Sequence, residues 1–371
     1  MRYILSGGGT AGHINPAIAI ADKLRELDSE SEILFVGSVS GMENKLVSLA
    51  GYPIWQLDVK GFKRSLSLSN IGAIIKTARS VRRAREILDS FRPDAVIGTG
   101  GYVCFPILFA AARQGIYTAL HESNAVPGLA VKMLKNKVDR IFVGFNECAE
   151  ALKVGDKCVC TGNPIKADFA ALDKDEARKK LGITGKYRYV VLSFGGSLGA
   201  RTVNELALNV MTEFTSKRSD VMHFHACGRI ESKAFYQELE GRGLDKCKNI
   251  AVSEYIYDMP VYLSAADAVM CRSGAMTLAE LAAAGAPSVL VPSPNVTGGH
   301  QYKNALAYKE AGAAFLVDER KPSDKEKAVE YIKTVITDKY RRQAMAEALK
   351  GVAHTDSSEL IAREIIQLKK R

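Results

Sequence analysis

The chain has 371 residues, which is enough for two domains with separate hydrophobic cores. Its composition, 47% hydrophobic and 25% charged, is that of an ordinary soluble globular protein. The longest apolar run, residues 102–112, contains Pro106 and falls short of the ~20 residues that a membrane-spanning helix needs. The net charge of +10 favours an anionic partner: nucleic acid, anionic lipid or a phosphorylated substrate.

The N-terminus and the cysteines indicate the compartment. Met1 and Arg2 lead directly into a strand pattern, so we expect no signal peptide. The seven cysteines are odd in number and scattered, and a chain of this size needs no disulfides to fold. We therefore expect reduced thiols and a cytoplasmic protein.

Short β-rich runs alternate with helical patterns along the chain. In the first half the predicted strands are Tyr3–Leu5, Ile33–Val36, Ile54–Val59, Ala95–Ile97, Thr118–Leu120, Arg140–Val143 and Cys158–Cys160. In the second half they are Tyr189–Ser193, Val221–His225, Ile250–Val252, Ala268–Cys271, Ser288–Val291 and Ala314–Val317. Strands separated by helices indicate βαβ units, and therefore an α/β fold with parallel sheets.

Both halves begin with a strand that feeds a glycine loop, as Rossmann-like domains do. The first reads YILSGGGTAG from Tyr3, and the second reads YVVLSFGGSLGAR from Tyr189. A turn-prone Gly-Asn-Pro tripeptide at 162–164 closes the first series of strands. We predict two Rossmann-like domains facing each other across a cleft. The predicted boundaries are 1–163, 164–351 and a C-terminal helix, 352–371, that packs back towards the first domain.

The first glycine loop has the G-x-G-x-x-G spacing of a dinucleotide site, at Gly7, Gly9 and Gly12. An NAD site also needs an acidic residue at the end of the second strand, but that strand ends in Val-Gly-Ser at 36–38. The second loop lacks the spacing altogether. Free N–H groups at a helix N-terminus bind any phosphate, so the two loops favour two phosphorylated ligands or one diphosphate.

Seven motifs lie just after a predicted strand or at the start of a helix, where open α/β domains bind ligands. They are GGGTAGHINP (7–16), GTGGYVCFP (98–106), HESNAVPG (121–128), TGNPIK (161–166), GGSLGAR (195–201), CRSGAMTLAE (271–280) and HQYKNA (300–305). In this order they resemble the MurG family closely. The resemblance covers the chain from Met1 to the C-terminal helix, and all seven motifs together are highly specific.

The resemblance implies a GT-B enzyme of bacterial wall synthesis. Such an enzyme is a hexosyltransferase that moves N-acetylglucosamine (GlcNAc) from UDP-GlcNAc, with inversion, onto an undecaprenyl-diphosphate-linked muramyl-pentapeptide. It would act at the inner face of the plasma membrane. The resemblance places the donor mainly in the second domain and the acceptor at the loops of the first.

The resemblance also implies a role for each site residue. Ser197 would hold the donor diphosphate and the backbone of Ile256 would read the uracil edge. Ala275, Met276 and Thr277 would open a helix whose positive end faces the phosphates. The remaining substrate contacts would be Glu280 on the ribose, Gln301 and Asn124 on the sugar, Lys166 near the diphosphate, and Thr10, Ala11 and Gly12 in the first loop.

Two positions depart from the family pattern. Ala11 stands where the family usually has glycine, and its methyl group is tolerable only if φ is negative there. Lys166 stands where many relatives carry arginine, so the charge is kept but bidentate geometry is lost.

The resemblance favours His13 as the catalytic base. A sugar hydroxyl that attacks an anomeric carbon must lose its proton, and imidazole titrates near neutral pH. The structural alternative is that His13 caps the helix or bonds a backbone carbonyl. Glu122 is the rival base, although a structural role suits it better.

Two cysteine and histidine patterns raise the question of a metal. His223, His225 and Cys227 alternate and would share one face of a strand, as a zinc site requires, but no second cluster completes the ligand set. Cys158 and Cys160 form only a C-x-C pair. No paired-Asp motif of the Mg²⁺-dependent sugar transferases is present, so we expect neither a metal nor a cofactor in the reaction.

A basic segment, 60–92, suggests contact with anionic membrane. Its basic residues are Lys60, Lys63, Arg64, Lys76, Arg79, Arg82, Arg83, Arg85 and Arg92. Leu66 and Leu68 precede an apolar stripe at helical spacing, Ile71–Val81, which also suits a helix packed by one face. The stretch 128–140 adds Lys132, Lys135 and Lys137. An enzyme with a lipid-linked acceptor must reach it at a membrane. The helix can therefore pack by one face while its remaining basic and apolar side chains contact lipid.

Two other functions remain open from the sequence. One is a GT-B transferase with a soluble acceptor, which would have no affinity for lipid. The other is a nucleic-acid-binding protein, suggested by the net charge. We find no RNA-binding signature and no aromatic residues interleaved with the basic ones in 60–92, so we expect no nucleic-acid partner.

Overall fold

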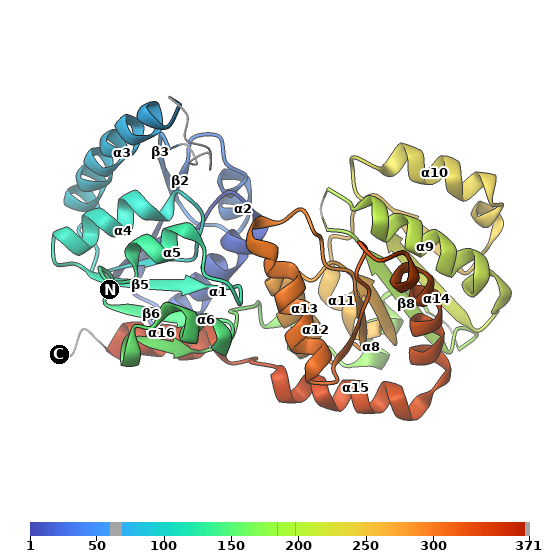
Figure 1. The fold of residues 1–371 in the computed structure, drawn as a ribbon. Coiled ribbons are helices and arrows are strands. Elements are labelled where there is room, and N and C mark those ends of the chain that lie inside the picture. Colours follow the sequence, from blue (N-terminus) through green and yellow to red (C-terminus); the bar gives the residue numbers. More distant parts are fainter. Residues whose placement is uncertain (60–68, 184, 197, 368–371) are drawn as a thin grey trace. The chain divides into compact units, whose positions relative to one another are not determined.

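The computed structural model describes residues 1–59, 69–183, 185–196 and 198–367. The chain divides into two compact units (Figure 1). The first unit consists of residues 1–166 together with the C-terminal segment from 354, and the second unit of residues 167–353. These units divide the chain at 166/167 and 353/354, whereas the boundaries predicted from the sequence are 163/164 and 351/352.

Among the described residues the first unit contains a seven-stranded parallel sheet in the order β3-β2-β1-β4-β5-β6-β7. Its strands are β1 (Arg2–Ser6), β2 (Glu32–Ser38), β3 (Ile54–Leu57), β4 (Ala95–Gly98), β5 (Tyr117–Glu122), β6 (Arg140–Val143) and β7 (Cys158–Cys160). Strand β3 is shorter than predicted because the N–H of Val59 turns back to the carbonyl of Leu57.

Helices cover both faces of this sheet. They are α1 (Ala11–Leu27), α2 (Glu43–Leu49), α3 (Ser69–Phe91), α4 (Cys104–Arg113), α5 (Leu129–Leu134), α6 (Asn146–Leu152) and α16 (Ser357–Gln367). One core joins α1 and α16 to the sheet and another joins α3, α4 and α5 to the opposite face. Successive strand residues alternate between the two cores, as the two-residue period of a strand requires.

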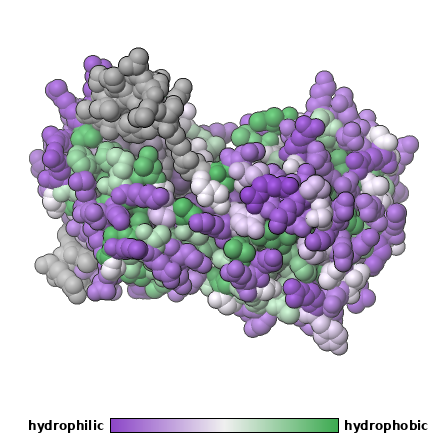
Figure 2. Space-filling view, viewed as in Figure 1, coloured by the Kyte–Doolittle hydropathy of each residue, from purple (hydrophilic) through white to green (hydrophobic). Residues whose placement is uncertain are grey.

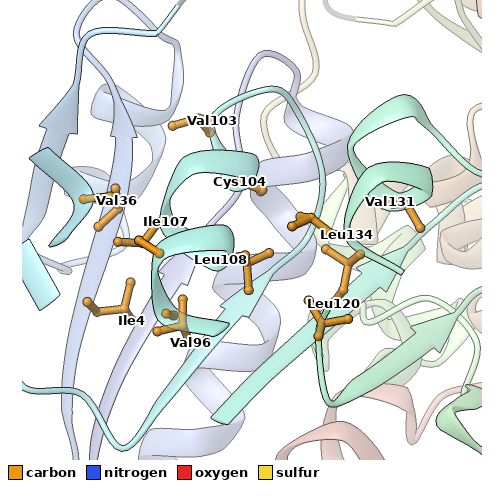
Figure 3. Packing of buried hydrophobic residues seen from close by; sticks show 14 of the residues in the cluster. Ile4, Val36, Val96, Val103, Cys104, Ile107, Leu108, Leu120, Val131 and Leu134 are labelled. Atoms are coloured by element: carbon orange, nitrogen blue, oxygen red, sulfur yellow. The ribbon is translucent and has the colours of Figure 1, made fainter. Parts of the chain in front are cut away.

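The core under α4 fixes the position of the loop that precedes this helix. Ile107 and Leu108 of α4 are fully buried and lie over Ile4, Val96 and Leu120 of the sheet (Figure 3). Each such side chain contributes about 1.5–3 kcal/mol on burial. This packing holds the end of β4 and the start of α4 in fixed positions next to β1.

The described residues of the second unit contain a six-stranded parallel sheet in the order β10-β9-β8-β11-β12-β13. Its strands are β8 (Tyr189–Phe194), β9 (Val221–Ala226), β10 (Ile250–Ser253), β11 (Ala268–Cys271), β12 (Ser288–Leu290) and β13 (Ala314–Leu316). Every strand predicted from the sequence is found in one of the two sheets, in parallel pairing.

The helices of the second unit alternate with its strands. They are α7 (Asp168–Ala171), α8 (Lys174–Lys180), α9 (Arg201–Glu213), α10 (Ser232–Gly241), α11 (Met259–Ala265), α12 (Ala275–Ala283), α13 (His300–Glu310), α14 (Pro322–Thr337) and α15 (Lys339–Val352). Short 3-10 turns lie at Gly155–Lys157 in the first unit and at Thr215–Lys217, Leu244–Lys246 and Thr297–Gly299 in the second.

The two sheets share one topology. Each begins in the middle, adds two strands to one side, then crosses over and continues on the other side, which is the strand order of a Rossmann fold. The predicted fold class, α/β with two Rossmann-like domains and parallel sheets, is confirmed. In the described part of the chain, no helix combines the length and the apolar character needed to cross a bilayer.

Candidate functional site

The strand order identifies one ligand-binding position in each unit. In an open α/β sheet, ligands bind beyond the carboxyl ends of the strands at the point where the order reverses. In the first unit this switch point lies between β1 and β4, and in the second between β8 and β11. The first and fifth of the predicted motifs, at 7–16 and 195–201, follow β1 and β8, and the second and sixth, at 98–106 and 271–280, follow β4 and β11.

At the first switch point, the loops after β1 and β4 are locked together. The N–H of Gly8 donates to the carbonyl of Gly100 (3.3 Å). A Cβ atom at Gly101 would overlap the carbonyl of Gly8, and Gly101 has a φ of +82°. A Cβ atom at Gly7 would overlap the hydroxyl of Thr99, which donates to the carbonyl of His13 (2.6 Å). The close approach of the two backbones therefore requires glycine here.

His13 lies in the first turn of α1, beside these loops, and is half-buried. Its Nδ1 is 3.0 Å from the carbonyl oxygen of Gly8 and 3.3 Å from Oγ1 of Thr10. A carbonyl oxygen can only accept a hydrogen bond, so the hydrogen of the neutral ring is on Nδ1. This leaves the lone pair on Nε2, which is the arrangement a general base needs.

The remainder of the first loop suits an anion. Ala11 is the first residue of α1 and lies in the right-handed helical region, so its methyl group causes no strain. Thr10 is the N-cap, and its hydroxyl contacts Nδ1 of His13 but makes no capping hydrogen bond to a backbone N–H of the helix; the first turn contains no acidic residue. With Gly12, these residues form a helix N-terminus that carries a partial positive charge and no internal cap.

Glu122 has a structural role in the same unit. It is buried and its carboxylate accepts hydrogen bonds from the N–H of Asn124 (3.0 Å), the side-chain amide of Asn124 (3.1 Å) and the N–H of Gly128 (2.7 Å). These contacts hold the turn between β5 and α5. They engage both oxygens of the carboxylate, as a structural role for Glu122 requires.

The structure adds a residue that the sequence analysis missed, Glu43. It begins α2 and is 1% exposed. Its carboxylate accepts from the N–H (2.8 Å) and hydroxyl (2.6 Å) of Ser38 and from the N–H of Gly9 (3.3 Å). Burial disfavours the charge, but these hydrogen bonds outweigh it and hold the pKa of Glu43 below its usual value.

In the second unit, α12 starts at the switch point without an internal cap. Its N-cap is Gly274, which has no side chain to cap the helix, and the first turn contains no acidic residue. Ala275 and Met276 are buried and Thr277 is half-buried. The N-cap of α9, Ala200, likewise makes no side-chain cap, and the first turn of α9 contains no acidic residue. Among the α-helices whose N-cap is described, only α8 and α15 have a side-chain cap, from Asp173 and Asp338.

Glu280 lies one turn into α12 and is only partly accessible. Within the described part of the chain, no donor is bonded to its carboxyl group. Burial raises its pKa to about 8, because the charged form loses water and gains no compensating hydrogen bond. A ligand with hydroxyl donors would supply the missing bonds.

The other predicted donor residues differ in their surroundings. Ile256 is 6% exposed and follows β10. Gln301 accepts the N–H of Ser293 through its side-chain oxygen (2.9 Å), which leaves its amide N–H groups to contact a ligand. Lys166 is exposed at the end of the first unit. Ser197 lies outside the described residues.

The alternating histidines form a buried hydrogen-bonded network with Ser193. The hydroxyl of Ser193 lies between Nε2 of His223 (2.8 Å) and Nδ1 of His225 (2.7 Å). Burial lowers the pKa of each imidazole to about 3, so both are neutral. Among the described residues, no group of three or more His, Cys, Asp or Glu side chains is placed to hold a metal ion.

Comparisons with known proteins identify the family. Residues 3–143 match the glycosyltransferase family 28 N-terminal domain, and residues 190–361 match its C-terminal domain. A relative from Acetivibrio thermocellus is 39% identical over 100% of this chain and 99% of its own. One from Halalkalibacterium halodurans is 37% identical over 97% of both. Both are named UDP-N-acetylglucosamine–N-acetylmuramyl-(pentapeptide) pyrophosphoryl-undecaprenol N-acetylglucosamine transferase.

This chain belongs to the MurG family of glycosyltransferases. The crystal structure of Acinetobacter baumannii MurG is similar, with a TM-score of 0.75, 25% identity and 99% coverage of each chain. A putative UDP-N-acetylglucosamine 2-epimerase from Listeria monocytogenes has a TM-score of 0.73 at 16% identity and 100% coverage of this chain, which shows a shared fold. The MurG-family chain is therefore a GT-B hexosyltransferase, as its sequence predicts.

Proposed function

We propose that this protein transfers GlcNAc, with inversion, from UDP-GlcNAc to a MurNAc-pentapeptide linked by a diphosphate to undecaprenol. The reaction is the one for which its full-length relatives are named, and it belongs to peptidoglycan synthesis. The observation that carries the proposal is His13, whose Nε2 lone pair is available at the switch point of the first unit. The alternative, a soluble acceptor, is not favoured by the relatives' names.

The second unit is the donor-binding unit in this proposal. The uncapped N-terminus of α12 stabilises the diphosphate, both in the bound donor and as charge grows on the departing UDP. Glu280 accepts hydrogen bonds from the ribose hydroxyls, and the backbone at Ile256 reads the uracil. The amide N–H groups of Gln301 bind the sugar. Ser197 and Lys166 complete the diphosphate contacts.

The first unit binds the acceptor and supplies the base. The acceptor diphosphate binds at Thr10, Ala11 and Gly12, where α1 begins without a side-chain cap. Asn124 contacts the sugar. His13 Nε2 takes the proton of the acceptor hydroxyl as its oxygen forms a bond to the anomeric carbon. The bond from that carbon to the UDP oxygen breaks on the opposite side, and UDP leaves with the electron pair.

The acceptor is lipid-linked, so we also propose that the first unit docks on anionic membrane. The docking face, which we call the α4–α5 face, combines apolar and basic side chains, and Figure 2 shows hydrophobic and hydrophilic residues interspersed where α4 and α5 lie. Leu129 is 59% exposed and Met133 43%. Arg113 and Lys137 lie over the ring of Phe109, at 5.2 and 5.4 Å from its centroid.

The neighbouring helix α3 adds positive charge to this face. The stretch 128–140 supplies less free charge than its sequence suggested. The exposed side of α3 bears Arg79, Arg82 and Arg83, while its Ala84, Ile87 and Leu88 are buried in the core. The sequence 60–68 lies outside the described residues. Lys135 bonds the carbonyl of Leu152 (2.8 Å), so its charge is used inside the unit. The protein would then be peripheral on the inner face of a bacterial plasma membrane.

One assay tests the proposed reaction. We expect the protein to release UDP from UDP-GlcNAc only when a lipid-diphosphate-linked MurNAc-pentapeptide is added. A muramyl-pentapeptide without the lipid diphosphate is the matched control and should support little release. Equal release with both acceptors would favour the soluble-acceptor alternative, and release with neither would contradict the proposal.

A further inference from the structure

Glu43 and His13 contact opposite sides of one peptide bond. The carbonyl oxygen of Gly8 accepts from Nδ1 of His13 (3.0 Å), and the N–H of Gly9 donates to Oε2 of Glu43 (3.3 Å). These two groups belong to the same peptide unit. In a trans peptide the C=O and N–H point in opposite directions, so this peptide lies between the carboxylate and the imidazole.

The surroundings of Glu43 are built to hold a carboxylate at this place. A Cβ atom at Gly8 or Gly37 would come within 2.8 or 2.7 Å of the Glu43 side chain, and one at Gly41 would overlap its carboxylate. Ser38 donates two hydrogen bonds to Oε1, which fixes the carboxylate and leaves Oε2 for Gly9. The lowered pKa of Glu43 keeps it charged.

We propose that Glu43 is a positioning residue that sets the tautomer of His13 through the Gly8–Gly9 peptide. The proposal rests on the role of His13 as the base. An anionic acceptor on the N–H polarises the amide, which strengthens the carbonyl as the acceptor for His13 Nδ1–H. The carboxylate thus acts on the imidazole as the Asp of a Ser-His-Asp triad does, but with one peptide bond between them.

The Gly8–Gly9 peptide needs a group that holds its orientation, because glycine is flexible. Gly9 has a φ of +84°, and glycine residues readily exchange left- and right-handed conformations. Without the carboxylate, the N–H of Gly9 loses its partner, and a rotation of the Gly8–Gly9 peptide that turns this N–H towards the imidazole becomes less costly. Nδ1 would then have to accept, the hydrogen would move to Nε2, and the base would be lost. A neutral side chain at 43 cannot hold the peptide as firmly, because charged acceptors form the stronger hydrogen bonds.

The test removes the negative charge of the Glu43 side chain and keeps the shape of that side chain. We expect Glu43→Gln to lower kcat by about 10- to 100-fold, less than the ~10⁴-fold loss when the directly bonded Asp of a triad is replaced. The KM for the acceptor and the affinity for UDP-GlcNAc should change little. Glu43→Asp keeps a carboxylate and should recover part of the rate. Ser38→Ala removes one of the two bonds to Oε1 but leaves Oε2 on Gly9, so its loss of kcat should be smaller than that of Glu43→Gln.

The tautomer itself can be measured by ¹⁵N NMR of histidine-labelled protein, with the His13 signals identified from a His13→Gln variant. We expect the wild-type ring to carry its hydrogen on Nδ1 and Glu43→Gln to shift the population towards Nε2–H. An Nε2–H ring in the wild type would overturn the proposal, even if Glu43→Gln fails to fold.

Two further outcomes separate the possible failures. If Glu43→Gln and Ser38→Ala lose kcat and thermal stability in parallel, with the tautomer unchanged, then Glu43 only supports the fold and the proposal is wrong. If His13→Ala retains full turnover, the base assignment fails independently, whatever the tautomer does in Glu43→Gln.

Discussion

The two switch points have the same topology and different chemistry. In the first unit, the loop after β1 is engaged by the protein itself. Gly8 bonds Gly100, Gly9 bonds Glu43, and His13 bonds Gly8. In the second unit, α12 begins without a cap and Glu280 is desolvated, with a pKa of about 8 and no donor bonded to its carboxyl group within the described part of the chain.

The difference indicates a division of labour. The first switch point is already organised around an imidazole, which suits a group that must react. The second contains a partly accessible carboxyl group with no hydrogen-bond donor among the described residues, which suits a group that must bind, because a ligand gains the free energy of making those bonds. In our proposal, the same sheet order supports a reacting site in one unit and a binding site in the other.

The largest expected effect comes from the imidazole. His13→Ala should lower turnover by about 10²- to 10⁴-fold, because proton removal from the acceptor hydroxyl would lose its base. The acidic limb of the rate profile should disappear with it, while UDP-GlcNAc binding by calorimetric titration should be unchanged. A small loss with the acidic limb retained would return His13 to a structural role.

Charge on the α4–α5 face and on α3 gives the next largest effect. Reversing Arg79, Arg82, Arg113 and Lys132 to Glu should abolish sedimentation with anionic vesicles, because each basic side chain near such a surface contributes about 1 kcal/mol. UDP binding should be spared. The matched control reverses four exposed lysines of the second unit, Lys179, Lys180, Lys233 and Lys246. If this control also loses vesicle binding, the effect is one of net charge.

Glu280 should determine donor affinity without affecting the base. At a pH above about 8, where the carboxyl group is ionised, Glu280→Ala should weaken UDP binding by about 10- to 150-fold, because hydrogen bonds to a charged acceptor contribute ~1.5–3 kcal/mol. Gln301→Ala serves as the comparison, since it should weaken UDP-GlcNAc binding and leave UDP binding nearly intact. Unchanged UDP affinity in Glu280→Ala would remove the ribose role.

The smallest expected effect is on stability. The folded protein holds a proton on Glu280 up to about pH 8, whereas the unfolded chain releases it near its usual pKa of 4.5. Glu280 therefore destabilises the fold increasingly as pH rises from 4.5 through 8. Glu280→Gln should raise the free energy of unfolding by about 1–2 kcal/mol at pH 9 and leave it unchanged at pH 4. Equal effects at both pH values would show that desolvation is not the cause.

The sequence predicted what depends on local pattern. Strand positions follow from short apolar runs bounded by turn residues, whereas the choice of His13 as the base rested on the resemblance to the family. The sequence also left His13 with a structural alternative, a bond to a backbone carbonyl. The structure shows that this bond exists, to Gly8. In our proposal the same bond orients the ring for catalysis.

Roles that depend on contacts between distant segments were not visible in the sequence. Glu43 lies thirty-four positions from Gly9, and only the pairing of β1 with β2 brings them together. The glycines at 37 and 41, which leave room for its carboxylate, are the signal that a reader of the sequence had available. Likewise, nothing local indicates that Lys135 bonds the carbonyl of Leu152.

The measurement that tests the division of labour most directly compares His13→Ala and Glu280→Ala in two assays, UDP-GlcNAc titration and single-turnover transfer at saturating donor. We predict a crossed result. His13→Ala should bind donor as the wild type does and transfer it at least about 100-fold more slowly. Glu280→Ala should bind donor weakly and transfer the bound sugar at a rate near that of the wild type. If each variant loses binding and transfer together, the two switch points are not separate in function and the account is wrong.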